Sequence, residues 1–494
     1  MPLTRNNKRN RVMRRKDVSR LREDPVIYNL YPCLAGFGID AYLVGGVVRN
    51  IICNIPVGYD YDFALTGKIR DAAERIAFTM HGSPFPLDKA AGSYRIVIKG
   101  GAYNSINIDL SLVSGRGITE DVLTRDFTIN AVAVDIKELF EKDNVSLIDP
   151  LNGARDARER HIIPVKDDIF DADPIRMLRA VRLAAQHSFN IDSRTEKLIK
   201  EKSYLLKTTS WERIRDDFFA ILDCCNAAYN LKRLYELGLL KEIFPEIKDW
   251  EKLKGYDLLS HVIKAVAEGE NLIYGLKGFI PVYEELVLQH FKSPASGNIS
   301  RSAFFRFVLF LHDAGKAFTM KSDDKCLRFT GHDAEGEAIA KKIARRLKLS
   351  RRLLVSLGKI VRNHHRVFNI ASLEKVSLRS KAHFFRVMDI DGLDLLFLSI
   401  ADARATRGSE DHELEELVKE LIPFYFDTYR VRKMPPILKG DEIMKIFQIP
   451  EGIIVGRILK KVQEAEGMGI VNDKEEAVEF IRGWLHGKAK GVDI

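Results

Sequence analysis

The chain has 494 residues, of which 46% are hydrophobic, so it is long enough for several domains with ordinary cores. Its formal net charge of +9 favours a polyanionic partner, although excess lysine and arginine is also a common solubility feature. Five cysteines without a CxxC pair argue against a disulfide framework. No apolar run is as long as a membrane span, and the basic N-terminus is not followed by the apolar stretch of an export signal. We therefore expect a soluble protein of the cytoplasm.

Residues 1–24 are mostly polar and carry nine lysines and arginines against three acidic residues. Such a charge block predicts a disordered arm. Two interpretations remain open, a solvated tail without a partner and a flexible arm that contacts RNA phosphates.

Residues 25–160 alternate between helix-like and strand-like segments, as in a mixed α/β domain. A short apolar run ends at Val44, and Gly45 and Gly46 then allow a tight turn and the close approach of a ligand to the backbone. Helical spacing restarts at Val47. The pattern predicts a strand, a turn and a helix start whose N–H groups face a phosphate.

Acidic residues lie on two predicted strands of this domain. Asp60 and Asp62 begin the strand 60–65 and point to the same face, because side chains alternate along a strand. In the predicted strand 106–111, apolar residues alternate with polar ones, so Asp109 points to the face opposite the core. Three carboxylates on one sheet are the ligands expected for a two-metal Mg²⁺ site. The alternative is a glycine turn with a solvated pair of aspartates.

These motifs, together with the segment Arg125-Asp126-Phe127-Thr128-Ile129-Asn130, resemble in order and spacing the head domain of class II tRNA nucleotidyltransferases, which include CCA-adding enzymes and bacterial poly(A) polymerases. The resemblance implies an α+β fold with a polymerase-β-like head and a mixed sheet, followed by an all-α neck, an HD domain and a C-terminal helical domain. It also implies that Asp60, Asp62 and Asp109 are the catalytic Mg²⁺ ligands. The residues implied to hold the triphosphate are Gly45, Gly46 and Arg49, and those implied to fix the ribose are Arg125, Asp126 and Asn130.

The helical neck is predicted over 161–247, and its motif Asp173-Pro174-Ile175-Arg176 resembles the family's base-reading segment. An aspartate accepts from the amino group of cytosine or adenine while an arginine donates to the ring nitrogen, so Asp173 and Arg176 would accept C and A and refuse U and G. The resemblance adds Arg179 and Arg182 to the nucleotide-binding residues. The family's motifs have Asp and Glu where this chain has Asn50 and Ala172, which affects local hydrogen bonding.

Seven of the twelve histidines lie within 248–410, and five of them, with Asp313 and Asp402, form a second cluster of candidate site residues. A His-Asp pair combined with histidines and an aspartate far away in the sequence is typical of a phosphohydrolase that binds one or two divalent ions. The order of these residues along the chain resembles the HD domain that is fused to some members of the same family. The resemblance implies phosphohydrolysis, including 2′,3′-cyclic phosphodiesterase action, with a divalent transition metal. His364 and His365 are both candidates for one ligand position. The predicted ligands are His261, His312, Asp313, His332, His364 and Asp402.

Residues 411–494 have helical spacing and are predicted to bind RNA, or else to be an ordinary helical core. The favoured function is template-independent addition of CCA to the 3′ end of tRNA, with ATP and CTP as substrates. The alternatives within the family are CC-only, A-only and poly(A) addition. From another class, the protein would be an HD phosphohydrolase that uses its head to bind RNA.

Overall fold

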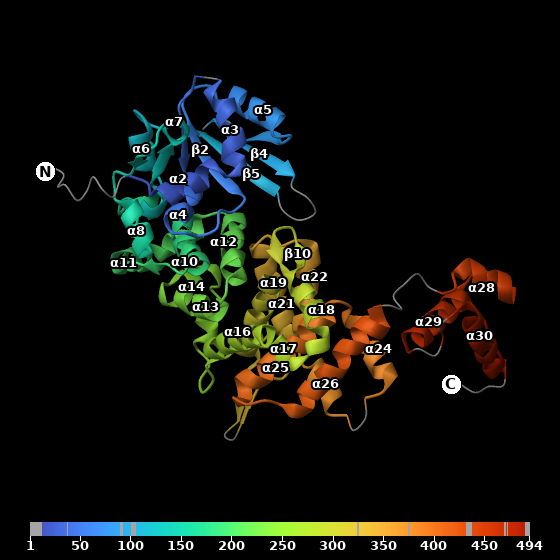
Figure 1. Ribbon diagram of the computed structural model, residues 1–494. Coiled ribbons are helices and arrows are strands. Elements are labelled where there is room, and N and C mark those ends of the chain that lie inside the picture. The colour runs from blue at the N-terminus through green and yellow to red at the C-terminus, as the bar shows by residue number, and fades with distance from the viewer. Residues whose placement is uncertain are drawn as a thin grey trace. The chain divides into compact units, whose positions relative to one another are not determined.

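The computed structural model describes residues 12–36, 38–88, 92–99, 105–323, 326–373, 376–430, 437–468, 471 and 473–489. Its described residues fall into two compact units (Figure 1). The first comprises Met1–Ser210 with Leu234–Ile243, and the second comprises Trp211–Arg233 with Phe244–Ile494. Within the described part of the chain, every helix is too short or too polar to cross a membrane.

A seven-stranded mixed sheet with the order β3-β4-β5-β2-β1-β6-β7 forms the core of the first unit. The pair β2 and β5 is parallel, and the other neighbours are antiparallel. The strands are β1 (Ala41–Val44), β2 (Asp60–Leu65), β3 (Ser83–Asp88), β4 (Ser93–Lys99), β5 (Ser105–Leu112), β6 (Ala133–Asp135) and β7 (Leu147–Ile148).

Apolar side chains of the central strands share one face of the sheet, because alternate side chains of a strand point to the same side. Leu43, Phe63 and Ile108 have no exposed surface. The helices of this part of the unit are α2 (Arg15–Arg22), α3 (Pro25–Ala35), α4 (Gly46–Ile52), α5 (Ile69–Thr79), α6 (Ile118–Val122), η1 (Thr128–Asn130), α7 (Ile136–Glu141) and α8 (Gly153–Glu159). The predicted α+β class with a mixed-sheet head is confirmed.

The prediction of a disordered arm over 1–24 is wrong for residues 12–24, while residues 1–11 lie outside the described residues. Helix α2 buries Val18 and Leu21. Its basic side chains bind main-chain carbonyl oxygens of the head instead of remaining solvated: Arg14 donates to Ile52 O at 3.1 Å and Arg22 to Leu139 O at 2.6 Å. The charge count concealed an amphipathic helix, and Arg14, Arg20 and Arg22 have protein partners.

The rest of the first unit is mostly helical, with one two-stranded parallel sheet. Its elements are β8 (His161–Ile162), α9 (Ile169–Ala172), α10 (Ile175–His187), β9 (Asn190–Ile191), α11 (Ser193–Lys202), η2 (Ser203–Thr208) and α14 (Leu239–Ile243).

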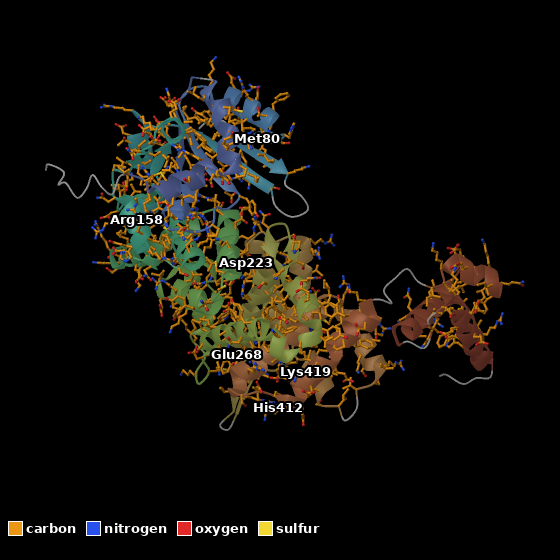
Figure 2. The ribbon with its side chains drawn as sticks, in the orientation of Figure 1. Met80, Arg158, Asp223, Glu268, His412 and Lys419 are labelled. Atoms are coloured by element: carbon orange, nitrogen blue, oxygen red, sulfur yellow. The ribbon has the colours of Figure 1, made fainter. Side chains whose placement is uncertain are left out.

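Helices dominate the second unit, which starts with α12 (Trp211–Asp223), ending at the residue Asp223 labelled in Figure 2. Its helices are α12, most of α13 (Ala227–Glu236), α15 (Ile247–Trp250), α16 (Leu258–Tyr274), α17 (Leu276–Phe279), η3 (Pro281–Tyr283), α18 (Glu284–Lys292), α19 (Arg301–Leu311), α20 (Lys316–Thr319), α21 (His332–Arg346), α22 (Arg351–Arg362), α23 (Arg366–Ala371), α24 (Leu378–Met388), α25 (Asp391–Arg407), α26 (His412–Pro423), η4 (Phe424–Tyr429), α28 (Gly440–Phe447), α29 (Ile453–Met468) and α30 (Lys474–Ala489). Its two hairpins are β10 (Pro294–Ser296) with β11 (Ile299–Ser300) and β12 (Lys321–Asp323) with β13 (Cys326–Arg328).

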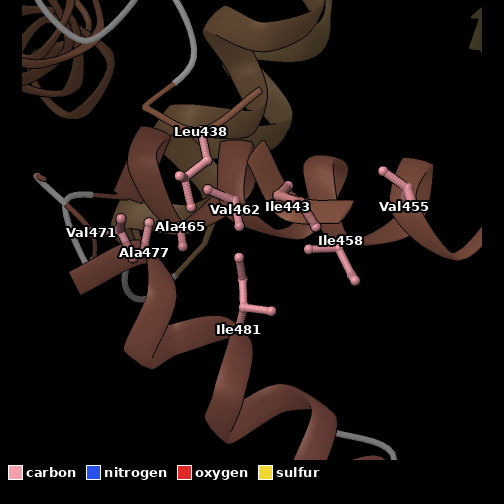
Figure 3. Packing of buried hydrophobic residues seen from close by; sticks show 9 residues of the cluster. All are labelled: Leu438, Ile443, Val455, Ile458, Val462, Ala465, Val471, Ala477 and Ile481. Carbon is pink, nitrogen blue, oxygen red and sulfur yellow. The ribbon is translucent and has the colours of Figure 1, made fainter. Parts of the chain in front are cut away.

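Aromatic residues fill the core of the second unit. Phe244 contacts Phe218 edge-on and Phe310 in a tilted arrangement, with ring centroids 5.2 Å apart in both pairs. The C-terminal helices α28, α29 and α30 have a separate apolar cluster that includes Ile443, Val462 and Ile481 (Figure 3).

The five predicted segments and the two observed units differ within the neck. Residues 161–210 belong to the unit that contains the sheet, whereas Trp211–Arg233 belongs to the unit that contains the histidine cluster. The helical spacing predicted the helices, but it carries no information on which long-range partner each helix buries its apolar face against.

Candidate active sites

Three carboxylates lie on one face of the head sheet, on two neighbouring strands. Asp62 on β2 lies directly opposite Asp109 on the parallel strand β5. Asp60 precedes Asp62 by two residues and therefore points to the same side. The structure thus places the three predicted metal ligands on neighbouring strands and on a common face, although their ligand atoms do not all lie within 4.8 Å of one another as those of the histidine–aspartate group in the second unit do.

Neighbouring side chains hold two of these carboxylates. Asn107 Nδ2 donates to Asp60 Oδ1 at 2.8 Å, and Arg95 donates Nε and Nη2 to the two oxygens of Asp109, both at 2.7 Å. Arg95 was missed from the sequence, although it lies opposite Asp109 in the antiparallel register of β4 and β5. Burial raises the pKa of Asp62 to about 6, and the charges of Asp109 and Asp60 add to that increase against the opposing effect of Arg125.

Gly45 brings the backbone against this acidic group. Its φ is +73°, which side chains rarely allow, and a Cβ built there would lie 2.7 Å from Asp62 Oδ2. Gly46 begins α4 immediately afterwards. The predicted glycine turn therefore leads past the carboxylates, and only glycine fits at its first position.

Arg49 is almost fully buried and is bonded to protein groups. Its Nη1 donates to Asn130 Oδ1 at 2.8 Å, its Nε and Nη2 donate to Asn50 Oδ1, and Nη2 lies 3.0 Å from His187 Nε2. Burial lowers the pKa of Arg49 to about 10. Burial and the charge of Arg49 lower the pKa of His187 to about 4, so this imidazole is a neutral acceptor. His187 was not predicted, because no local pattern relates residue 187 to residue 49.

The 125–130 motif connects the head to α10. Asp126 accepts hydrogen bonds from Phe127 N at 2.8 Å, Asn130 Nδ2 at 3.0 Å and Arg179 Nη1 at 3.1 Å. Burial alone would raise the pKa of Asp126, but the charge of Arg179 and these hydrogen bonds lower it below its ordinary value. Arg125 Nη2 lies 3.4 Å from Asp121.

The predicted base-reading pair is at the start of α10. Arg176 Nε lies 4.0 Å from Asp173 Oδ2, and its Nη1 donates to Ile169 O at 3.4 Å. Arg179 and Arg182 follow at three-residue intervals and so lie on a similar face of the helix. The two side chains of the predicted pair therefore lie beside each other.

The second unit brings the six predicted HD-type ligands together. His261 Nε2 lies 3.1 Å from Asp313 Oδ2 and 3.3 Å from Asp402 Oδ1. His312 Nε2 lies 3.3 Å and 3.5 Å from the same two oxygens. His332 Nε2 and His364 Nε2 lie 3.5 Å and 3.6 Å from Asp313 Oδ1. These ligands come from α16, the residues following α19, the start of α21, the residues following α22, and α25.

Further groups complete this centre. Lys316 donates to Asp313 and lies 3.2 Å from Tyr256 Oη, and neither residue was predicted. Burial lowers the pKa of His364 to about 3. For His312 burial acts in the same direction, but the charge of Asp313 outweighs it and raises the pKa to about 10. The chemistry of this donor set, with imidazole nitrogens and carboxylate oxygens in a buried site, suits a divalent transition metal.

Comparison with known proteins gives matches along nearly the whole chain. Residues 41–163 match the model of the poly A polymerase head domain, and residues 188–251 match a probable RNA- and SrmB-binding site of polymerase A. The chain is 28% identical to the A-adding tRNA nucleotidyltransferase of Deinococcus radiodurans, over 92% of this chain and 97% of that protein. It is also 28% identical to the CC-adding tRNA nucleotidyltransferase of Thermus thermophilus, over 91% of this chain and 94% of that protein.

Solved structures share the fold. The Thermotoga maritima CCA-adding enzyme complexed with tRNA has a TM-score of 0.61 and 22% identity, covering 96% of this chain and 99% of that one. A CCA-adding enzyme with CTP has a TM-score of 0.62 and 23% identity, covering 95% and 98%. The head-domain match and the two relatives support the class II tRNA nucleotidyltransferase family and identify the chain as an enzyme.

Proposed function

We propose that this enzyme, whose relatives support the class II tRNA nucleotidyltransferase family, adds CMP and AMP to the 3′ end of tRNA without a nucleic-acid template. The observation that carries the proposal is the placement of Asp60, Asp62 and Asp109 on one sheet face, with Asp62 against the turn at Gly45. A phosphate seat next to clustered carboxylates is what nucleotidyl transfer requires.

The acidic group fits Mg²⁺. The raised pKa of Asp62 reflects burial beside two other carboxylates, and a hard cation relieves that repulsion through oxygen ligands. Asp60, Asp62 and Asp109 would hold the ions. When bound, Mg²⁺ supplies activation of the primer hydroxyl and stabilisation of the leaving pyrophosphate.

In this proposal, basic residues of the head and α10 hold the nucleotide. Gly45 and Gly46 let the backbone approach the triphosphate, and Arg49 and Arg179 supply positive charge. Asn130 and Asp126 fix the positions of these two arginines through the hydrogen bonds described above. Arg125 and Arg182 complete the basic lining, and the ribose lies against the 125–130 segment.

The base is selected by amino acids. Asp173 accepts from the exocyclic amine of cytosine or adenine, and Arg176 donates to the adjacent ring nitrogen. Uracil and guanine present an acceptor and a donor in the reverse order, so Asp173 and Arg176 would both lack a hydrogen-bond partner on these bases. Because the pair serves both accepted bases, it supports addition of the full CCA end.

Partial addition is the second candidate, because the two relatives described above are named A-adding and CC-adding. One gel distinguishes the candidates, together with poly(A) synthesis. The purified protein is incubated with tRNAs that end at the discriminator base, at C and at CC, with each NTP separately and together. A CCA-adding enzyme extends all three tRNAs. A CC-adding enzyme does not extend the tRNA that ends at CC, whereas an A-adding enzyme extends only the tRNA that ends at CC.

We also propose a metal-dependent phosphohydrolase at the histidine–aspartate centre, acting on substrates such as 2′,3′-cyclic phosphates. The convergence of His261, His312, Asp313 and Asp402 supports it. The alternative of another class is that this is the main activity and that the head only binds RNA.

Two variants separate these functions. Asp60→Asn should lose NMP incorporation and keep hydrolysis, and His312→Ala should lose hydrolysis and keep incorporation. His312 is fully buried, so circular dichroism and a melting curve must first show a native fold. Loss of both activities from either folded variant would contradict two independent sites, and full incorporation by Asp60→Asn would contradict the assigned head site.

A further inference from the structure

We infer that the open face of strands β3 and β4 binds the 3′-terminal nucleotide of the RNA, with its base stacked on Phe85 and its phosphate paired with Arg95. The site rests on the proposed nucleotidyl transfer and gives a position to the attacking RNA end, for which the predicted residues provide no group. Its occupant is single-stranded RNA next to the carboxylates of the head.

A row of directly paired residues crosses the head sheet from its edge to the glycine turn. Phe85 on β3 pairs with Arg95 on β4, Arg95 with Asp109 on β5, Asp109 with Asp62 on β2, and Asp62 with Val44 on β1. Residues directly opposite each other on neighbouring strands point to the same side, so Phe85 and Arg95 share the face of the carboxylates. Strands lie about 4.8 Å apart, so Phe85 is about 10 Å from Asp109, roughly the size of one nucleotide.

The face that carries Phe85 and Arg95 is open, whereas the opposite face is covered. Ile96 alternates with this row and is fully buried, and a Cβ on Gly82, just after α5, would lie 2.7 Å from Ile96 Cγ2. Helix α5 therefore covers the Ile96 side of the strands. Phe85 is 41% exposed, and the side chains of Arg95 and Asp109 keep 36% and 27% of their surface exposed. An aromatic ring and an arginine are thus accessible beside the carboxylates.

The direction of attack places the RNA end on this side of the carboxylates. In nucleotidyl transfer the attacking and leaving oxygens lie roughly in line, on opposite sides of the phosphorus. In the proposed function the triphosphate lies at the turn of Gly45, which follows β1. The sheet order β3-β4-β5-β2-β1 puts β4 and β3 on the far side of Asp62 and Asp109 from that turn. The attacking hydroxyl therefore arrives from the side of β4 and β3.

The exposed groups fit a single-stranded nucleotide. Every base can stack on an aromatic side chain, and arginine pairs with phosphate oxygens. A peptide strand added to the edge of β3 fits less well, because Pro84 and Pro86 flank Phe85 and lack the N–H groups that strand pairing needs. The occupant of this edge therefore binds side chains and not the backbone.

A phosphate competes with Asp109 for Arg95. Arg95 Nε and Nη2 donate to the two oxygens of Asp109, and the same fork geometry fits a phosphate. Ion pairs of this exposure are weak, so the exchange is accessible. Among the described residues, the ligand atoms of the three head carboxylates do not all lie within 4.8 Å of one another. Release of Asp109 by Arg95 would free it for the metal, so RNA and metal should each strengthen the binding of the other.

Binding of tRNA tests the stacking position. The full chain is titrated without NTP, so that no transfer occurs, with labelled tRNAs that end at the discriminator base, at C and at CC. Phe85→Ala should weaken binding of each roughly ten-fold, as loss of one stacked base does, and Phe85→Trp should restore it to within about two-fold. The KM for tRNA should rise in parallel, while the KM for NTP stays unchanged. Phe78→Ala is the matched control, because Phe78 is 84% exposed but lies on α5, which covers the other face.

Arg95→Gln tests the exchange. We expect weaker tRNA binding but tighter Mn²⁺ binding in the absence of RNA, because Asp109 is no longer held. Electron paramagnetic resonance measures free Mn²⁺, and the head fraction of the bound ions is the part that Asp60→Asn removes. Arg70→Gln should change neither quantity, since Arg70 is an exposed arginine of α5 paired with Glu74.

Two results would overturn the inference. One is wild-type tRNA affinity in Phe85→Ala. The other is weaker Mn²⁺ binding by Arg95→Gln, which would mean that Arg95 only positions Asp109 for the metal. Failure of the wild-type chain to extend any of the three tRNAs would instead contradict the proposed nucleotidyl transfer, so the two failures are distinguishable.

Discussion

The head and the second unit both gather acidic side chains, but the two groups are built differently. The carboxylates of the head stand on adjacent strands, offer oxygen only, and are partly exposed, with Arg95 bound to Asp109. The centre of the second unit is buried and combines imidazoles with carboxylates from several helices. An open oxygen site suits a hydrated ion that arrives with a nucleotide, whereas a buried nitrogen-rich site suits a resident transition ion.

Selective chelation should have the largest effect on this contrast. 1,10-Phenanthroline binds transition metals far more strongly than Mg²⁺. With excess Mg²⁺ present, we expect hydrolysis of a 2′,3′-cyclic nucleotide to fall to background while NMP incorporation stays within about two-fold, because the donor sets differ in softness. Both reactions are measured in the same preparation, and Mn²⁺ or Ni²⁺ should restore hydrolysis. Equal loss of incorporation would show that the two sites do not differ in this way.

Gly45→Ala tests how tightly the head site is built. The added Cβ would lie 2.7 Å from Asp62 Oδ2, at a φ of +73°. Displacing a catalytic group by about an ångström lowers kcat/KM for incorporation by roughly 100-fold, while hydrolysis should be unaffected. Gly58→Ala is the control, since a Cβ there meets nothing within 4 Å. Wild-type incorporation by Gly45→Ala would mean that the turn does not constrain Asp62.

Arg176→Ala should change nucleotide choice more than total incorporation. Loss of one paired base contact costs about 1–3 kcal/mol of discrimination, so the preference for C and A over U and G should fall roughly ten-fold or more. Competition between NTPs at a fixed tRNA end measures it. Arg194→Ala serves as control, because this arginine is exposed and paired with Asp167. An unchanged preference would remove the reading role of the Asp173–Arg176 pair.

The sequence predicted those parts of the sites that depend on local pattern. Alternation along 60–65 and 106–111 placed the three aspartates on one face, and the glycine pair predicted the turn. The contact of Arg49 with His187 and the position of Asp313 among four histidines depend on pairings between distant segments, which spacing does not encode. The choice between His364 and His365 stayed open because adjacent histidines look alike in a sequence. In the structure His364 Nε2 lies 3.6 Å from Asp313 Oδ1, and His365 Nε2 lies 3.0 Å from His332 Nε2.

The smallest expected effect concerns a histidine of the head. His187 and His364 both have a lowered pKa, His364 through burial in the metal centre and His187 through burial beside Arg49. The pKa of the His187 imidazole is about 6.5 in the unfolded chain and about 4 in the folded chain. The free energy of unfolding therefore loses a contribution as the pH falls from about 6.5 towards 4.

His187→Gln keeps an oxygen acceptor for Arg49 and removes the titration. At pH 7.5 the variant should be close to wild type in stability. At pH 5 the free energy of unfolding of the variant should fall less than that of wild type, by roughly 1 kcal/mol after allowance for partial solvent exposure. Urea unfolding at the two pH values measures the difference, and His383→Gln is a control on an exposed histidine. An identical pH dependence of the free energy of unfolding for His187→Gln and wild type would contradict the lowered pKa of His187 that burial and the charge of Arg49 produce.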